Sequence, residues 1–194
     1  FWTALAVMIL FALPASAEII ISEVMASNGT YINGEAYDWV ELHNTGSKKV
    51  NLEGCYLSDS KKNLLKWQFP SGTSIKAGGY VLVYCTGEDM SPGKNSTFYA
   101  NFKISASGDQ VFLTAADGET PMAFADLPAQ YGNVSWGKAE GSEAWGYFAQ
   151  ATPGKKNEKT VSSARAEEPE LLTSGGFYGE AVTVQAKGAD GVTL

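Results

Sequence analysis

The chain has 194 residues, of which 44% are hydrophobic and 12% aromatic, and its formal net charge is −7. This composition is far from that of a disordered chain, so it predicts a folded, aromatic-rich interior. The negative charge argues against nucleic-acid binding, because no basic surface is available to displace counterions from phosphate groups.

The first 17 residues, FWTALAVMILFALPASA, form an apolar run that ends in a proline and the small-x-small tripeptide ASA. Signal peptidase accepts this pattern, so we expect residues 1–17 to be a secretory signal that is cleaved before Glu18. The alternative is an uncleaved membrane anchor, although an apolar run of 13 residues before the proline is short for a bilayer core of about 30 Å. Either interpretation predicts export, and therefore a secreted or cell-surface location.

From Glu18 to about Ala151, short alternating or apolar runs are separated by glycine, proline, asparagine and aspartate, which is typical of an all-β domain. So many short strands predict a sandwich or barrel with Greek-key connections, because a single open sheet would leave one apolar face wet. The predicted strands are Ile19–Val24, Trp39–His43, Cys55–Ser58, Lys66–Phe69, Tyr80–Cys85, Asn101–Ile104, Gln110–Ala115, Met122–Ala125, Val134–Gly137 and Trp145–Phe148.

The stretch DWVELHN in the second predicted strand combines two acids with the chain's only histidine, His43. Its residues alternate, so that Val40 and Leu42 face one way and Glu41 the other, and this period of two is typical of a half-buried strand. A hydrolytic triad is not indicated, because no Gly-x-Ser-x-Gly elbow or activated cysteine accompanies the histidine. The stretch is therefore predicted to build the sheet.

Glu23 in the first predicted strand and Glu41 in the second are candidates for a pair of catalytic carboxylates. If their strands pair, both side chains lie on one face, and a glycosidase needs two such groups about 5 to 10 Å apart. No cleft-forming pattern accompanies them, and charged residues on the outer face of a sandwich are usually solvated. We therefore favour a structural role for both and predict no catalytic residue in this chain.

The two cysteines, Cys55 and Cys85, lie in strand-like segments and leave two alternatives open. In an exported chain, neighbouring strands could bring them together as a disulfide if their Cβ vectors agree. They could equally be separate buried thiols that pack as small apolar side chains. Neither a CxxC nor an HxxxH spacing is present to predict a zinc site.

Two further binding hypotheses concern calcium and sugars. Aspartates at predicted turns offer oxygen ligands for calcium, but no EF-hand or nonapeptide spacing supports a site, so we expect them to stabilise turns and expect no cofactor. Aromatic side chains could form a sugar-stacking platform, although core packing explains most aromatics in such a domain. The aspartates are Asp38, Asp59, Asp109, Asp117 and Asp126, and the aromatics are Tyr31, Tyr37, Trp136 and Trp145.

After the stretch ATPGKKN the composition changes. Residues 158–173 are predominantly charged or small and polar, which predicts a solvated linker after a main domain of residues 18–157. Strand alternation resumes at Ala181–Ala186, but about two dozen residues cannot bury a core of their own. We therefore expect residues 174–194 to be the truncated start of a second β module.

Six blocks of the sequence resemble, in order, the motifs of the lamin tail domain as it occurs in secreted bacterial proteins. They are IIISEVMASN, DWVELHNTG, VNLEGCYLSD, WQFPSGTSIKAGGYVLVYC, NFKISASGDQVFL and ATPGKKN. The resemblance implies an immunoglobulin-like β-sandwich, in which Asn44 satisfies backbone groups at the turn that follows its strand. The residues that we assign to the structural motif are Glu23, Asp38, Trp39, Glu41, Leu42, Asn44, Gly54, Asp59, Trp67, Phe69, Pro70 and Gly79.

Residues 174–194 resemble the opening of a chitobiase/hexosaminidase C-terminal-type module, a pairing that often precedes CotH-like kinase domains in bacterial surface proteins. Together the resemblances imply a non-catalytic interaction or scaffolding module of a secreted or cell-surface bacterial protein. Its partners would be an unknown protein, a cell-wall glycan or neighbouring domains of the same polypeptide, with no nucleic acid and with membrane contact only through an uncleaved signal segment. The alternatives are an accessory domain of a larger enzyme, a CotH-like kinase or a hydrolase, and a carbohydrate-binding module.

Overall fold

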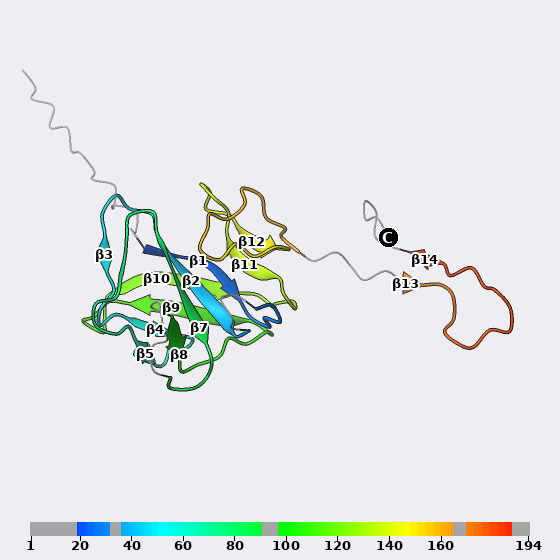
Figure 1. The fold of residues 1–194 in the computed structure, drawn as a ribbon, viewed down its shortest axis with the longest axis horizontal. Coiled ribbons are helices and arrows are strands. Elements are labelled where there is room, and N and C mark those ends of the chain that lie inside the picture. The colour runs from blue at the N-terminus through cyan, green and yellow to red at the C-terminus, as the bar shows by residue number, and fades with distance from the viewer. Residues whose placement is uncertain (1–18, 32–35, 91–96, 165–169, 188–194) are drawn as a thin grey trace, which may run out of the picture.

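The computed structural model describes residues 19–31, 36–90, 97–164 and 170–187 (Figure 1). All regular elements in these ranges are β-strands, and most belong to two sheets that pack face to face, so the predicted all-β sandwich is confirmed. No helix in this part of the chain is long and apolar enough to cross a membrane. The predicted signal at residues 1–17 lies outside the described residues.

The larger sheet has six strands. Neighbouring strands in it are antiparallel, except for the final pair in the order given next, which is parallel. In spatial order the strands are β12 (Trp145–Phe148), β11 (Ser135–Lys138), β1 (Ile19–Met25), β2 (Asp38–Asn44), β7 (Tyr80–Cys85) and β8 (Phe98–Ala100). The first strand of the chain therefore lies inside this sheet, between β2 and β11.

The smaller sheet has four antiparallel strands, in the order β10 (Pro121–Leu127), β9 (Asp109–Thr114), β4 (Tyr56–Ser58) and β5 (Trp67–Gln68). In Figure 1 the blue strands β1 and β2 of the larger sheet lie across the green strands β9 and β10 of this one. Two isolated pairs complete the structure: β3 (Val50–Asn51) pairs with β6 (Ser74–Ile75), and β13 (Glu170–Leu171) pairs with β14 (Ala186–Lys187).

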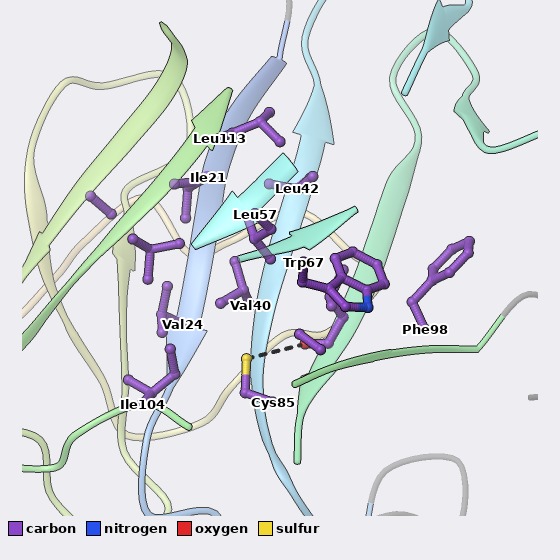
Figure 2. Packing of buried hydrophobic residues seen from close by; sticks show 14 of the residues in the cluster. Ile21, Val24, Val40, Leu42, Leu57, Trp67, Cys85, Phe98, Ile104 and Leu113 are labelled. Atoms are coloured by element: carbon purple, nitrogen blue, oxygen red, sulfur yellow. Dashed lines mark hydrogen bonds between the residues drawn. The ribbon is translucent and has the colours of Figure 1, made fainter. Parts of the chain in front are cut away.

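The core lies between the two main sheets. Figure 2 shows Val40 and Leu42 of β2 facing Leu57 and Leu113 of the smaller sheet, as the alternation in DWVELHN predicts. All four side chains are at most 1% exposed, and full burial of a leucine or valine contributes about 1.5–3 kcal/mol. Near the end of β5, the rings of Trp67 and the following phenylalanine meet edge to face with their centroids 4.7 Å apart.

Most predicted strands form with bounds shifted by one or two residues, and Tyr80–Cys85 and Trp145–Phe148 form as predicted. The prediction of a strand at Asn101–Ile104 is wrong, because the strand is Phe98–Ala100 and ends just before it. The error arose because buried residues alternate with exposed ones here as they do in a strand, with Phe102 and Ile104 buried. The Phe102 carbonyl still accepts a hydrogen bond from the Gly87 amide, but no regular ladder continues.

The two cysteines are separate buried thiols in the structure, so the disulfide alternative does not hold there. Cys55 immediately precedes β4 of the smaller sheet, and its sulfur lies 3.8 Å from the sulfur of Met122. Cys85 ends β7 of the larger sheet, and its sulfur lies 3.9 Å from the carbonyl oxygen of Val83 (Figure 2). The two thiols thus have different neighbours in different sheets.

Contacts with the sandwich continue for five residues beyond the predicted domain end at residue 157. Tyr147 of β12 exchanges two backbone hydrogen bonds with Ser162, at 2.8 and 3.2 Å, and Val161 packs against Gly146 so closely that a Cβ at that glycine would lie 2.5 Å from the valine. The sandwich therefore includes the first residues of the predicted linker. Further on, the predicted strand Ala181–Ala186 is wrong, since β14 holds only its last residue, and residues 174–187 are all exposed.

A buried carboxylate pair and the segment that it holds

A bulge in β1 sets the position of Glu23. Ile21 pairs with Leu42 and Glu23 pairs with Glu41, so Ser22 has no partner opposite it on β2. Without the extra residue, the period of two would place Glu23 on the same face as Ile21, inside the core. The bulge turns the glutamate to the outer face of the sheet, directly beside Glu41, which is a common use of bulges.

Glycine at position 137 is required beside this bulge. Gly137 of β11 pairs with Glu23 across the strands, and a Cβ there would lie 2.6 Å from the carbonyl oxygen of Ser22. Real Cβ atoms do not approach a backbone oxygen so closely, and a backbone atom cannot move aside as the end of a side chain can. The sequence therefore has the one residue that lets β11 approach the bulged strand.

The outer face of the larger sheet is covered by residues 151–157, the stretch ATPGKKN, which we call the strap. Glu23 lies under it and is completely buried. Its carboxylate accepts hydrogen bonds from the Thr152 backbone amide, at 3.1 and 3.2 Å, from the Thr152 hydroxyl at 3.1 Å and from the Ser135 hydroxyl at 2.5 Å. One carboxylate thus joins β1, β11 and the strap.

Glu41 holds the next turn of the strap. It is also completely buried, and its two oxygens accept from the Ser22 hydroxyl at 2.7 Å and from the Gly154 backbone amide at 2.5 Å. Gly154 has φ of +75°, a left-handed conformation that a glycine adopts without steric cost. The turn that presents this amide to Glu41 therefore favours glycine.

Asn157 closes the end of the strap. Its side-chain amide donates to the carbonyl oxygens of Ser22 and Lys138, both at 2.9 Å, and its own oxygen accepts from the Thr152 hydroxyl at 2.9 Å. The Ser22 carbonyl belongs to the bulge residue that has no partner on β2. Asn157 thus satisfies a backbone group that the bulge leaves without a ladder partner, as buried polar groups require.

Burial dominates the electrostatics of the pair. It raises the pKa of Glu41 from 4.5 to about 8, against the opposing effect of the Gly154 and Ser22 hydrogen bonds, and the charge of Glu23 raises it further. Burial also raises the pKa of Glu23, although Ser135 and Thr152 oppose the shift. Among the described residues neither carboxylate forms an ion pair. The expectation that these acids are solvated is therefore wrong, because the strap covers them.

A groove of about 710 Å³ runs along the outer face beside the strap. His43 and Tyr80 stand next to each other on one side, with ring centroids 4.2 Å apart and planes 11° from parallel. The other side is formed by the β11–β12 turn and by Lys156 of the strap, which is paired with Glu140 at 2.7 Å. Burial lowers the pKa of His43, so its imidazole favours the neutral form.

The other predicted motif residues have structural partners. Asn44 donates to the carbonyl oxygens of Lys48 and Ile75 and accepts from the Gly46 amide, so it satisfies the turn after β2 as expected. Trp39 is fully buried in a second cluster on the outer face, with Met25, Tyr84 and Tyr99. Leu42, Trp67 and Phe69 belong to the main core. Gly54 has a φ of +77°. The Gly79 carbonyl accepts a hydrogen bond from the backbone amide of Asn44, and the Pro70 carbonyl accepts one from Thr73.

The aspartates considered for calcium are not brought together. No group of three or more histidine, cysteine, aspartate or glutamate side chains suited to a metal occurs in the described part of the chain. Each of the five has a hydrogen-bond or ion-pair partner instead, but the turn interpretation is wrong for Asp126, which lies within β10 and pairs with Gln110 across the strands. Asp38 accepts from the Asn28 amide, Asp59 pairs with Lys66, Asp109 accepts from the Ser105 amide, Asp117 accepts from the Thr120 amide and Asp126 accepts from Gln110.

The four aromatics considered for sugar stacking do not form one platform. Trp136 and Trp145 lie near each other on β11 and β12, with centroids 6.4 Å apart, and both pack partly against the core. The Tyr147 ring extends this row, 4.8 Å from Trp136. Tyr31 is 76% exposed and Tyr37 is exposed as well, but both belong to the chain between β1 and β2.

The two facing sheets define an immunoglobulin-like β-sandwich whose most buried polar residues serve to hold its own chain. The family model of the lamin tail domain matches residues 13–127, more than half of the chain, and the chain belongs to the lamin tail domain family, a non-enzymatic β-sandwich family. The matched residues end with β10, so the place of β11, β12 and the strap in the domain comes from the structure. No curated protein matches the chain.

Proposed function

We propose that this chain is a non-catalytic interaction or scaffolding module of a secreted or cell-surface bacterial protein. The observation that carries the proposal is the complete burial of the carboxylate pair. Glu23 and Glu41 are the strongest catalytic candidates in the sequence, yet both are closed to solvent. A general acid or base must come within hydrogen-bond reach of its substrate, and these oxygens are already occupied by strap and strand donors.

The strap also supports a scaffolding role. It ties the chain that leaves the sandwich to β1 and β2, through contacts between residues 129 and 113 positions apart in sequence. A module of this kind holds its entering and leaving segments in a defined geometry. In a polypeptide that also carries a catalytic domain, such as a CotH-like kinase or a hydrolase, the same module would act as an accessory domain.

The partners that we propose are an extracellular protein, a cell-wall glycan or neighbouring domains. The test is a pulldown from cell-wall and surface extracts, together with a glycan array, using purified residues 18–164 with calcium and then with a chelator. Saturable binding that resists chelation supports the interaction module. Loss of binding only with chelator would restore the calcium hypothesis, and no binding in either condition would leave a spacer without a ligand.

Carbohydrate binding is a second candidate, and one observation favours it. Trp136, Trp145 and Tyr147 form a row of neighbouring, partly exposed rings on a single face of β11 and β12. Aromatic faces of this kind combine apolar contact area with polar edges. If the row binds glycans, Trp145→Ala should abolish array binding while Tyr31→Ala, in a separate exposed loop, leaves it unchanged; equal binding by both variants would exclude the row.

A further inference from the structure

The strap closes over two acids that form no ion pair with any residue in the described ranges. Glu23 and Glu41 are direct cross-strand partners, both completely buried, and their hydrogen-bond donors among the described residues are hydroxyls and backbone amides. Two carboxylates at paired positions in a water-excluded site cannot both ionise cheaply, because each disfavours the charge of the other and burial disfavours both. The closed arrangement is therefore best satisfied when the pair retains a proton.

The hydrogen bonds are compatible with one retained proton on Glu41. Glu23 accepts from the Ser135 hydroxyl, from the Thr152 amide and from the Thr152 hydroxyl, whose single proton also faces Asn157, whereas Glu41 accepts from one hydroxyl and one amide. The Ser22 hydroxyl beside Glu41 can reverse its direction and accept from a protonated carboxyl, since a hydroxyl both donates and accepts. The second oxygen of Glu41 then still accepts from the Gly154 amide, so protonation preserves the contact that holds the strap.

We propose that the strap, residues 151–157, is a proton-linked latch that closes while the Glu23–Glu41 pair shares a proton and opens when that proton is lost to solvent. Opening the strap exposes the pair to water, where both carboxylates ionise near their ordinary pKa of 4.5. Because the closed form binds one proton more, the ratio of open to closed strap rises with pH, by at most about tenfold per pH unit.

Other ionisable groups surround the pair and bear on this equilibrium. His43 lies two residues after Glu41 on β2, and Tyr80 stacks on it from β7, where burial and then the charge of Glu41 raise the pKa of the phenol. Lys156 of the strap is paired with Glu140 of the β11–β12 turn, and Lys138 is paired with Glu143. Burial lowers the pKa of His43, so its imidazole is neutral through the upper part of the range in which Glu41 titrates. Both lysines have a carboxylate partner outside the pair, so the titrating group that the strap itself covers is the carboxylate pair.

The consequence of opening is a change at the exit of the domain. The strap and the following residues up to Ser162 are held on the outer face by Glu23, Glu41 and the backbone of Tyr147. When the carboxylate contacts are lost, the chain that leaves the sandwich is no longer fixed against β1 and β2. The orientation of whatever follows the domain would then depend on external pH, which is a property that suits an exported protein.

Hydrogen exchange of the full chain tests the latch. The amides of Thr152 and Gly154 donate to the pair and report on opening, while the amide of Leu52, which donates to the Thr73 carbonyl, is a buried reference with no carboxylate contact. After correction for intrinsic exchange, we expect protection of both strap amides to fall at least about tenfold between pH 5.5 and pH 8 relative to Leu52. Protection ratios that stay constant over this range would overturn the proposal.

Neutral variants locate the proton. Glu41→Gln keeps the size and one acceptor oxygen but cannot ionise, so its strap amides should stay protected at pH 8, with the pH dependence reduced to less than about threefold. The control is Glu53→Gln, because Glu53 also accepts a backbone amide, that of Gly72, but is exposed; its profile should match the unmodified chain. A Glu41→Gln profile that keeps the full pH dependence would refute the latch. If the variant does not fold, the profile of the unmodified chain still decides.

Discussion

The contribution of Asn157 to stability can be worked out from its three hydrogen bonds. The change Asn157→Ala removes both donors to the Ser22 and Lys138 carbonyls and one of the two acceptors beside the Thr152 hydroxyl, the other being Glu23. A typical intramolecular hydrogen bond contributes about 0.5–1.5 kcal/mol net, and a buried group left without a partner costs about 1–3 kcal/mol. Asn157 is 8% exposed and lines the groove, so water can reach part of the site, and we expect a loss of about 2–4 kcal/mol.

Urea unfolding followed by tryptophan fluorescence measures this loss, and an unchanged slope with denaturant would show that the two-state comparison is valid. The expected fall in Tm is about 4–16 °C for a domain of this size. Asn101→Ala is the matched control, because that exposed side chain donates a hydrogen bond to the Lys66 carbonyl, and its loss should cost no more than about 0.5 kcal/mol. Equal losses for the two variants would refute the role of Asn157 in holding the strap.

Three further outcomes are expected. Gly137→Ala should destabilise the domain by about 1–3 kcal/mol or more, because the new methyl group meets a backbone oxygen. The control, Gly132→Ala, has open space around it and should not destabilise the domain. Equal unfolding midpoints for the two variants would contradict this prediction. Both thiols should resist alkylation in the folded protein, since burial raises the pKa of Cys55 and of Cys85. In denaturant two thiols should react, and mass spectrometry would show the added mass. The free energy of unfolding should fall as pH rises from about 5 to about 8, because the pKa of Glu41 is raised in the fold, by up to about 1.4 kcal/mol per pH unit; a pH-independent urea midpoint would count against it.

The sequence was sufficient to predict the larger strands and the inner face of β2. Period-two alternation identified Val40 and Leu42 as core residues, and both are fully buried. Glu23 and Glu41 were placed on one face only on the condition that their strands pair, and β1 and β2 do pair. Strands of two residues, such as β3 and β6, were missed because they are too short to show any period.

The burial of the outer face was missed for a physical reason. Its cover is the strap, more than 110 residues away in sequence from the carboxylates that it contacts, and local periodicity contains no information on such contacts. The bulge at Ser22 was missed as well, since only the register with β2 reveals it. One signal was available: Trp39 shares the outer face with Glu41, and a tryptophan of that size on a strand favours a covered surface.

The titration of the two buried glutamates tests the central claim most directly, which is that this pair holds the strap and does not act on a substrate. The side-chain carboxyl carbons of Glu23 and Glu41 can be followed by NMR from pH 4 to pH 9, together with the Gly154 amide. The account predicts that Glu41 titrates near pH 8 and that the Gly154 amide shifts with the same midpoint. Titration of both glutamates near pH 4.5, with a Gly154 amide that does not respond, would contradict it.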